Sequence, residues 1–456
     1  MNQPPWDQWQ DALYERVDAL SDGRVSLDAA TRRRAALVVV DDMAAMAAAL
    51  DEPKVRALSE AAVRIEPTAE ASHITGNLSG RAWAALVNAV AANWNELDEG
   101  YRPATCHGGL YALPAAMAEV EARGGTLGEL LSAVVVGYEV STSYARVLRP
   151  PRPFALHPHA TMAPIGAAAA VAAIRGSAGP GIRAASQVAI TLAAAGPFDH
   201  AMKGLLIRNG WAGHGALTGF TAVELAAAGI MGDASSARGV LERGFRYPLD
   251  EAELAIEPSH WAVHDGYHKS YACCQYSHSA VEATLSLLSG GLRDVPVADI
   301  ASVVVDANPL AMSLNDANPT SVLGGKFSLP HCVSAVIVRG NADAEAFSDA
   351  YVNDPAVIAL RTKITVQPYE GDLEPPYDRP ARVIATTTSG EVYSEECRSA
   401  LGGPDRPLSD ADVLDKIELI TRAQFPLFGT AARSLVEGTM SDDAAWSDVL
   451  GALWSR

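Results

Sequence analysis

The sequence contains little lysine and cysteine, and it has no long apolar run. Of its 456 residues only six are lysine, whereas 29 are arginine. The 54 acidic residues exceed these 35 basic residues, which gives a net charge of −19. Such a charge excludes a surface built to bind nucleic acid or anionic lipid. The longest apolar segments, such as residues 160–174, are too short to span a bilayer. We therefore expect neither nucleic acid nor a membrane as a partner.

The five cysteines, two of them adjacent, do not form the pattern of a disulfide framework. Residues 1–6 also lack the charged start and apolar run of a secretory signal. Both features predict a cytoplasmic protein. Because 49% of the residues are hydrophobic, the chain has ample material for a core, and its length favours two domains.

Residues 1–266 are predicted to form a large helical domain. Alanine-rich segments with apolar residues three and four positions apart occur at residues 29–49, 81–93, 114–121, 127–147, 160–174, 181–195, 212–228 and 234–241. Small side chains on several faces of these segments would let the helices approach closely. Asp42, near one predicted helix end, is expected to be solvated or to cap the helix.

The pattern changes after residue 266. Runs rich in β-forming residues occur at 301–307, 363–367, 381–388 and 391–394. Helical stretches at 326–340 and 343–353 lie between the first two of these runs. Residues 267–400 are therefore predicted to form an α+β domain. After a Gly- and Pro-rich linker, Ser409 and Asp412 indicate a helix start, so residues 401–456 are predicted to return to the helical domain. The predicted fold class is mainly α, a large all-helical domain built from both chain ends plus a smaller α+β lid domain.

The segment with the most chemically reactive side chains is residues 268–278, which combine two histidines, a lysine, two cysteines and two tyrosines. Arginine is the usual cation in this chain, so Lys269 suggests a need for a compact ammonium group with a tunable pKa. His264 and His268 have a spacing that can hold zinc. No glutamate follows the first histidine, however, and the cysteines are adjacent, so we predict no metal site.

Three other segments place polar side chains next to helix starts. Residues 93–109 combine acidic residues with His107 on a loop, where the alternative is an exposed acidic loop. His157 either faces a pocket or caps the helix that follows it. Residues 199–215 place Lys203 before a Gly-rich backbone that suits an anion, or they simply connect two helices. Neither a phosphate-binding loop nor a nucleophile elbow is present.

Four motifs, in the right order and over nearly the whole chain, resemble the MmgE/PrpD family. Residues 137–140, followed by His157 and a proline, are similar to its GYEV…HPT block. Residues 203–215 resemble the block that joins a lysine to a Gly-rich helix start. Residues 269–278 resemble the motif KPYPCCRYTHP, and residues 326–330 match the motif KFSLP.

The resemblance implies a homodimer with its pocket at the domain interface. It also implies a reaction without metal or cofactor, namely dehydration, decarboxylation or epimerisation of a small polycarboxylate. Lys203 and Lys269 would then bind carboxylates and stabilise the charge that develops during proton abstraction. His107 and His157 would serve as acid or base, and Asp98 would orient a histidine.

Several positions depart from the family pattern. Residues 96–101 replace the LDFDDTH acidic cluster, and His159 interrupts the HPTGT block. His331 stands where many members have a tyrosine, a candidate proton donor, and Cys274 stands where decarboxylase-like members have a histidine. We therefore expect His331 among the catalytic residues, and the substrate-binding residues are expected to be Asp98, His159, Cys274 and His278.

The sequence thus predicts a cofactor-independent lyase that removes a proton next to a carboxylate of a small di- or tricarboxylate. Dehydration is the primary prediction. The alternatives are an epimerase, isomerase or decarboxylase acting on a related polycarboxylate, and a non-catalytic binding paralogue.

Overall fold

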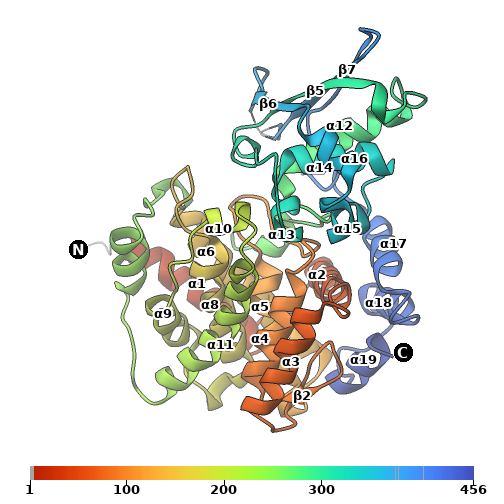
Figure 1. Ribbon diagram of the computed structural model, residues 1–456. Coiled ribbons are helices and arrows are strands. Elements are labelled where there is room, and N and C mark those ends of the chain that lie inside the picture. Colours follow the sequence, from red (N-terminus) through yellow and green to blue (C-terminus); the bar gives the residue numbers. More distant parts are fainter. Residues whose placement is uncertain (1–4, 375, 378, 404, 456) are drawn as a thin grey trace.

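The computed structural model describes residues 5–374, 376–377, 379–403 and 405–455; Pro404 of the predicted linker, like residues 1–4 and 456, lies outside this part. Figure 1 shows a large body of helices joined to a smaller body that carries a four-stranded sheet. The fold is mainly α with a small α+β domain, which confirms the predicted fold class. None of the helices in the described part of the chain is long and apolar enough to cross a membrane.

The first half of the chain supplies most of the helical domain. Its helices are α1 (Pro5–Ser21), α2 (Ala29–Ala47), α3 (Pro53–Ile65), α4 (Arg81–Ala92), α5 (Gly108–Arg123), α6 (Leu127–Val147), α7 (Pro158–Thr161), α8 (Ala163–Arg175), α9 (Ile182–Thr191), α10 (Asp199–Met202) and α11 (Ile207–Ala227). The Ala-rich segments predicted as helices up to residue 228 each overlap these elements. The segment predicted at 234–241 is instead a π-helical stretch at Arg238–Gly244.

Close packing around α8 follows from small residues on it and on its neighbours. This helix contacts α5, α6, α9 and α11 and is buried along most of its length. A Cβ atom added to Gly137 of α6 would lie 2.6 Å from the carbonyl oxygen of Gly166, and one added to Gly215 of α11 would lie 2.4 Å from the Cβ of Ala163. Larger side chains at these contacts would therefore force the helices apart.

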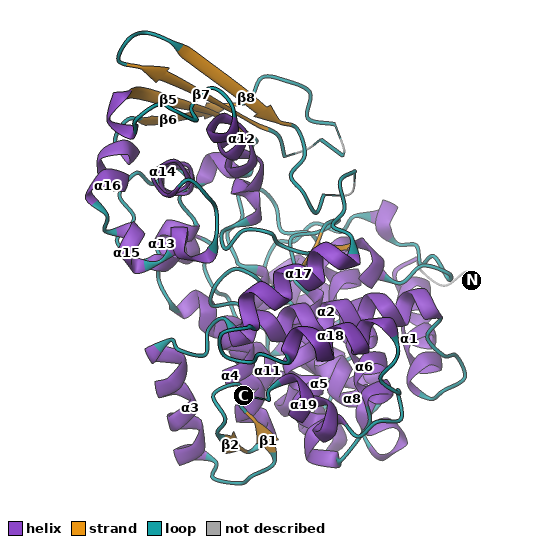
Figure 2. Cartoon of the chain, turned by 90° about the vertical axis from the view of Figure 1, so that its right-hand side faces the viewer, coloured by secondary structure: helices purple, strands orange, loops and turns teal. Residues whose placement is uncertain are grey.

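The C-terminal helices return to the same core. They are α17 (Asp410–Thr421) and α18 (Phe428–Glu437), which pack on α2, and α19 (Trp446–Leu453), which packs on α5 and α6 (Figures 1 and 2). One hydrophobic cluster contains buried residues from 6–263 and again from 413–453. Ser409 and Asp412 form a capping box at the start of α17, as predicted, with the Asp412 N–H donating to Ser409 Oγ at 3.2 Å and the Ser409 N–H to Asp412 Oδ2 at 2.9 Å.

The smaller domain is a sheet with helices on one face. Its strands are β5 (Ile300–Ala307), β6 (Ile364–Pro368), β7 (Ala381–Thr387) and β8 (Val392–Cys397), in the order β6-β5-β7-β8, with only the β5–β6 pair parallel. The helices below the sheet in Figure 2 are α12 (His278–Ser289), α13 (Val322–Lys326), α14 (Leu329–Arg339), α15 (Asp349–Val352) and α16 (Pro355–Arg361). Buried and half-buried residues alternate along β7 because one face packs on α12.

Two short strand pairs lie outside this sheet. One, β1 (Ala71–Ser72) with β2 (Leu78–Ser79), lies near α3. In the other, β3 (Gly100–Tyr101) runs antiparallel to β4 (Gly266–Tyr267), with Gly100 opposite Tyr267. A Cβ atom at Gly100 would lie 2.5 Å from the tyrosine ring, so a larger residue would collide with it. The loop after α4 and the reactive segment 268–278, distant in sequence, are thereby brought side by side.

The prediction for Asp42 is wrong. This residue lies within α2 and is fully buried, and its Oδ1 accepts a hydrogen bond from the Glu99 N–H at 2.9 Å. Burial, together with the neighbouring carboxyl of Glu99, raises the pKa of Asp42 well above its usual range. The helix pattern could not reveal this position because the partner belongs to a loop 57 residues further along the chain.

Candidate active site

A pocket that is partly open to solvent lies between the two domains. The helical domain contributes the loop after α4 and the starts of α5, α7 and α11. The α+β domain contributes Phe327 and residues from two loops. The lining residues are Glu96, Tyr101, Thr105, Cys106, His107, His157, Pro158, Phe198, Arg208, Tyr267, Lys269, Cys274, Gln275, Tyr276, Phe327 and Arg379.

His107 and Asp98 form an oriented pair at this pocket. His107 is the N-cap residue of α5, and its Nδ1 lies 2.7 Å from Asp98 Oδ2 and 2.7 Å from the carbonyl oxygen of Glu99. Both neighbours can only accept a hydrogen bond, so Nδ1 carries the proton of the neutral ring. The other nitrogen, Nε2, is then unprotonated and able to act as a base.

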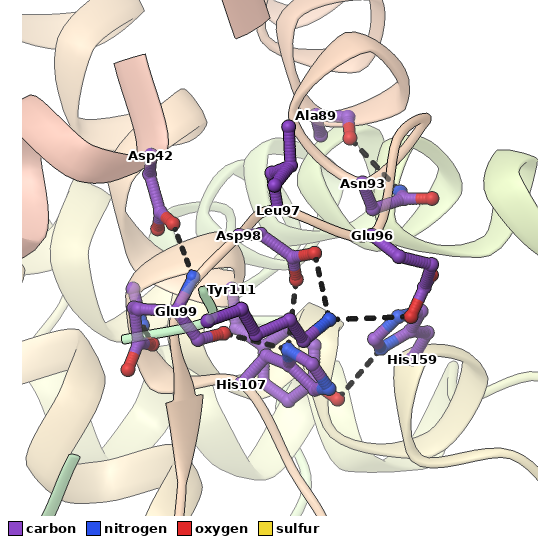
Figure 3. A network of polar contacts seen from close by, with 12 residues as sticks. Asp42, Ala89, Asn93, Glu96, Leu97, Asp98, Glu99, His107, Tyr111 and His159 are labelled. Atoms are coloured by element: carbon purple, nitrogen blue, oxygen red, sulfur yellow. Dashed lines mark hydrogen bonds and ion pairs between the residues drawn. The ribbon is translucent and has the colours of Figure 1, made fainter. Parts of the chain in front are cut away.

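Two cations and two carboxylates meet at the pocket, and we refer to Glu96, Asp98, Arg208 and Lys269 as the charge cluster. Figure 3 shows its two carboxylates, Glu96 and Asp98, on the loop after α4. The Lys269 Nζ lies 3.2 Å from Glu96 Oε2 and 3.3 Å from Asp98 Oδ1. Arg208 forms an ion pair with Glu96 Oε1. Each of these side chains is at most 2% exposed. Buried charges are tolerated only when they are paired, and here the formal charges sum to zero.

The members of the charge cluster keep one another ionised. Burial alone would raise the pKa of Asp98, but Lys269 and His107 hold it well below its usual range. Burial also opposes ionisation of Glu96, yet Arg208 and Lys269 lower its pKa. Burial acts to lower the pKa of Lys269, whereas Asp98 and Glu96 raise it above its usual value. Lys269 is therefore a fixed cation and not a general base.

His157 and His159 are neutral imidazoles at the start of α7. Burial and the nearby positive charge of Arg208 lower the pKa of both rings well below the usual value. The Nδ1 of His157 accepts a hydrogen bond from the His159 N–H at 3.2 Å, so His157 caps the helix and also lines the pocket. His159 does not line the pocket, and its Nδ1 lies 2.9 Å from the hydroxyl oxygen of Tyr111 (Figure 3).

Cys274 also lines the pocket, and burial raises the pKa of its thiol to about 12. A thiol of this kind stays protonated near neutral pH, so it offers a weakly polar surface to a ligand and no reactive thiolate.

The remaining predicted residues do not line this pocket. Lys203 has a 63% exposed side chain paired with Asp199, and its role stays a prediction from the sequence. His278 is buried with its Nε2 3.3 Å from the carbonyl oxygen of Cys273, and burial lowers its pKa to about 3. His331 is buried in the α+β domain, 6.5 Å from the Phe347 ring centre, and burial likewise lowers its pKa to about 3.

Sequence reasoning missed Glu96, Arg208 and Arg379. Arg208 lies five positions after Lys203 in the same Gly-rich segment, but arginine is the common cation of this chain, so its residue type gave no signal. Glu96 stands two positions before Asp98 in the acidic run of residues 93–109, from which only Asp98 and His107 were predicted as site residues. Arg379 lies in the α+β domain, outside every motif that resembles the family, so no signal in the sequence pointed to it.

The loop of residues 95–99 is held in place from two other parts of the chain. Lys326 of α13 donates to Asn95 Oδ1 at 2.7 Å. Lys416 of α17 donates to the carbonyl oxygen of Leu97 at 3.0 Å. The α+β domain and the C-terminal return therefore both fix the loop that carries the acidic side of the charge cluster.

Glu99 differs from the other carboxylates of this loop because it is buried without a cation beside it at ion-pair distance among the described residues. Its Oε1 accepts from the Gly109 N–H at 2.5 Å and its Oε2 from the Tyr138 hydroxyl at 3.1 Å. Burial raises its pKa to about 8. The folded state therefore binds a proton that an unfolded glutamate releases near pH 4.5. The resulting stabilisation is complete below that pH and is lost as pH rises through about 8.

We expect Glu99→Gln to flatten the pH dependence of stability. The amide resembles the protonated carboxyl, so the variant should avoid the loss of up to about 5 kcal/mol that a shift of this size implies for the wild type. Denaturant unfolding at pH 6 and pH 9 measures the difference. A free energy of unfolding that falls equally in both proteins would show that Glu99 is already ionised at pH 6.

The fold and the pocket define a two-domain protein whose candidate site lies between a helical domain built from both chain ends and an α+β domain. Residues 24–246 match the model of the MmgE/PrpD N-terminal domain, and residues 271–436 match that of the MmgE/PrpD C-terminal domain. Together these matches cover most of the chain, and the chain belongs to the MmgE/PrpD family.

Two curated relatives are similar to most of this chain at low identity. The cis-aconitate decarboxylase of Mus musculus is 26% identical over 356 residues, which cover 73% of this chain and 70% of the relative. The cis-aconitate decarboxylase of Homo sapiens is 24% identical over 360 residues, which cover 73% of this chain and 71% of the relative. These relatives are enzymes, which places the chain in a family with lyase activity.

Proposed function

We propose that this protein is a lyase that removes a proton from the carbon next to a carboxylate of a small di- or tricarboxylate, using only groups of the protein. The observation that carries this proposal is the Asp98–His107 pair beside the buried charge cluster. A base must lie within reach of the proton it removes, and the pair supplies an unprotonated Nε2 at the pocket wall.

Each of the other groups has a part in the proposed reaction. Arg208, Lys269 and Arg379 place positive charge around the pocket of a chain whose net charge is −19. Such charges hold a substrate carboxylate and stabilise the negative charge that develops on it as the proton leaves. In a dehydration the hydroxyl leaves as water with the proton that His107 has taken up, and the neutral ring of His157 at the pocket wall orients this hydroxyl by a hydrogen bond.

Decarboxylation is the second candidate reaction, supported by the two relatives named cis-aconitate decarboxylases. Both reactions need the same cationic surroundings for a carboxylate, so the pocket alone supports either one. The two reactions differ in their products, because dehydration gives an unsaturated acid that keeps every carboxylate, whereas decarboxylation releases carbon dioxide and removes one carboxylate.

Incubation of the protein with 2-methylcitrate, citrate, cis-aconitate, malate and iminodisuccinate in D₂O, followed by proton NMR, tests the proposal. We expect one of these compounds, or a close analogue, to lose water with formation of an unsaturated acid. Release of carbon dioxide would instead establish the decarboxylase. Deuterium uptake without net conversion would establish an epimerase or isomerase, and binding without any uptake would refute the proposed chemistry in favour of a non-catalytic paralogue.

A further inference from the structure

Lys326, the last residue of α13, carries a buried ammonium group without a carboxylate partner. The residue is 2% exposed, and its Nζ lies 2.7 Å from Asn95 Oδ1 and 3.4 Å from the carbonyl oxygen of Trp94. No carboxylate of the described residues lies at ion-pair distance from it. Burial lowers the pKa of this group to about 8. Because a buried charge without a counter-ion costs free energy, packing alone would favour an apolar side chain at this position.

The ammonium group joins the α+β domain to the loop after α4 in the helical domain. Asn95 of this loop accepts from Lys326 through Oδ1, and its Nδ2 donates to the carbonyl oxygen of Ala48, at the end of α2, at 2.8 Å. The next residue, Glu96, has a φ angle of 55°, in the left-handed region that residues other than glycine seldom adopt. Strained conformations of this kind persist only when the surrounding structure holds them. The anchored amide of Asn95 is therefore part of what holds Glu96 in place.

Glu96 connects this anchor to the cations of the charge cluster. Its carboxylate contacts both of them, with Oε1 in an ion pair with Arg208 and Oε2 3.2 Å from the Lys269 Nζ. Under the proposed function these cations hold a substrate carboxylate and stabilise the charge that develops on it. Such stabilisation depends on charges that are already in place before the reaction. A displacement of Glu96 would therefore disturb the two cations on which the reaction depends.

The backbone around Lys326 is held at the pocket by contacts that do not involve the ammonium group. The Lys326 carbonyl oxygen accepts from the Cys274 N–H at 2.9 Å, and the Phe327 ring centre lies 5.2 Å from the guanidinium carbon of Arg208. Cys274, Phe327 and Arg208 all line the pocket. A substitution that removes only the ammonium group should therefore leave the end of α13 in place.

We propose that Lys326 is a positioning residue, which holds Asn95 across the domain interface and thereby sets the placement of Glu96 and of the two cations that Glu96 contacts. This assignment deepens the proposed function and rests on it, because it assumes that these cations act on a substrate carboxylate. Loss of the ammonium group should slow the reaction without destabilising the fold, since the site loses an anchor while the interior loses an unpaired charge. A lysine that serves packing alone would have the opposite effect.

Turnover and denaturant unfolding of Lys326→Met test the assignment, with 2-methylcitrate, citrate, cis-aconitate, malate and iminodisuccinate as the compounds supplied in D₂O. We expect kcat to fall by about 10- to 100-fold, as for a small misplacement of groups at a site. The denaturant midpoint should be at least as high as in the wild type, because an apolar side chain of similar size replaces a buried charge. Lys363→Met is the control, since Lys363 is half-buried in the same domain, donates to the carbonyl oxygen of Ile300 at 2.7 Å and does not line the pocket.

Asn95→Ala removes the acceptor on the other side of the contact and provides a second, independent variant. If Lys326 acts through Asn95, the double variant should be no slower than Asn95→Ala alone. Effects that multiply in the double variant, a Lys326→Met protein as active as Lys363→Met, or one less stable than the wild type would each overturn the assignment while leaving the proposed function intact. A wild type that is inactive towards all five compounds would overturn the proposed function and the assignment with it.

Discussion

Lys269→Met is expected to slow turnover by about 10²- to 10³-fold and to lower the free energy of unfolding by about 3 to 5 kcal/mol. The ammonium lies between Glu96 and Asp98, and all three side chains are almost completely buried. Its removal leaves Glu96 with Arg208 and Asp98 with His107, and both buried carboxylates lose the ammonium group that they share. The same change removes positive charge that would stabilise the carboxylate of the reacting substrate.

Two measurements on one preparation test this expectation, solvent deuterium incorporation into the substrate and denaturant unfolding. Lys54→Met is the control, because Lys54 lies exposed on α3 and the change removes the same charge without unpairing a buried carboxylate. A Lys269→Met protein with the stability of the control would show that the charge cluster is not the paired network described above.

His107→Gln is expected to slow proton removal by about 10²- to 10⁴-fold while leaving the protein folded. Glutamine can still donate a hydrogen bond to Asp98, but it has no nitrogen that accepts a proton near neutral pH. The side chain of His107 is 13% exposed at the pocket wall, so its replacement creates no large buried cavity. Loss of the base should therefore appear in the rate and not in the stability.

The rate of deuterium incorporation at saturating substrate, together with the melting temperature, separates these effects. His214→Gln provides the matched change at an exposed histidine of α11 that does not line the pocket. If His107→Gln and His214→Gln exchange deuterium equally fast, another residue is the base, and His157, the other histidine at the pocket wall that the resemblance assigns as acid or base, would be the next candidate.

Local sequence patterns predicted much of the fold because helix periodicity and helix capping depend on interactions between residues that are close in sequence. The helix of residues 127–147 was predicted with the bounds it has, and Ser409 and Asp412 marked the start of α17 through hydrogen bonds between residues three positions apart. The same reasoning failed at Asp42, because a carboxylate in a helix is predicted to be solvated unless its tertiary partner, here the Glu99 N–H, is known.

The candidate site could be predicted only in part, because side chains from distant segments define it. His107, His157 and Lys269 were predicted from motifs and do line the pocket. The choice between Lys203 and Arg208 depends on which side of α10 and α11 faces the α+β domain, and no spacing rule supplies that. In the same way, Glu96 contacts the two cations from a left-handed backbone conformation, which the residue type at that position does not signal.

The most direct test of the central claim is the incorporation of solvent deuterium at the carbon next to the carboxylate of a bound substrate. It requires the wild-type protein, a dicarboxylate or tricarboxylate that calorimetry shows to bind, and proton NMR in D₂O. Proton abstraction by His107 predicts loss of one carbon-bound proton signal in the wild type and its persistence in His107→Gln. A substrate that binds to the wild-type pocket and keeps every carbon-bound proton, without conversion to any product, would contradict the account.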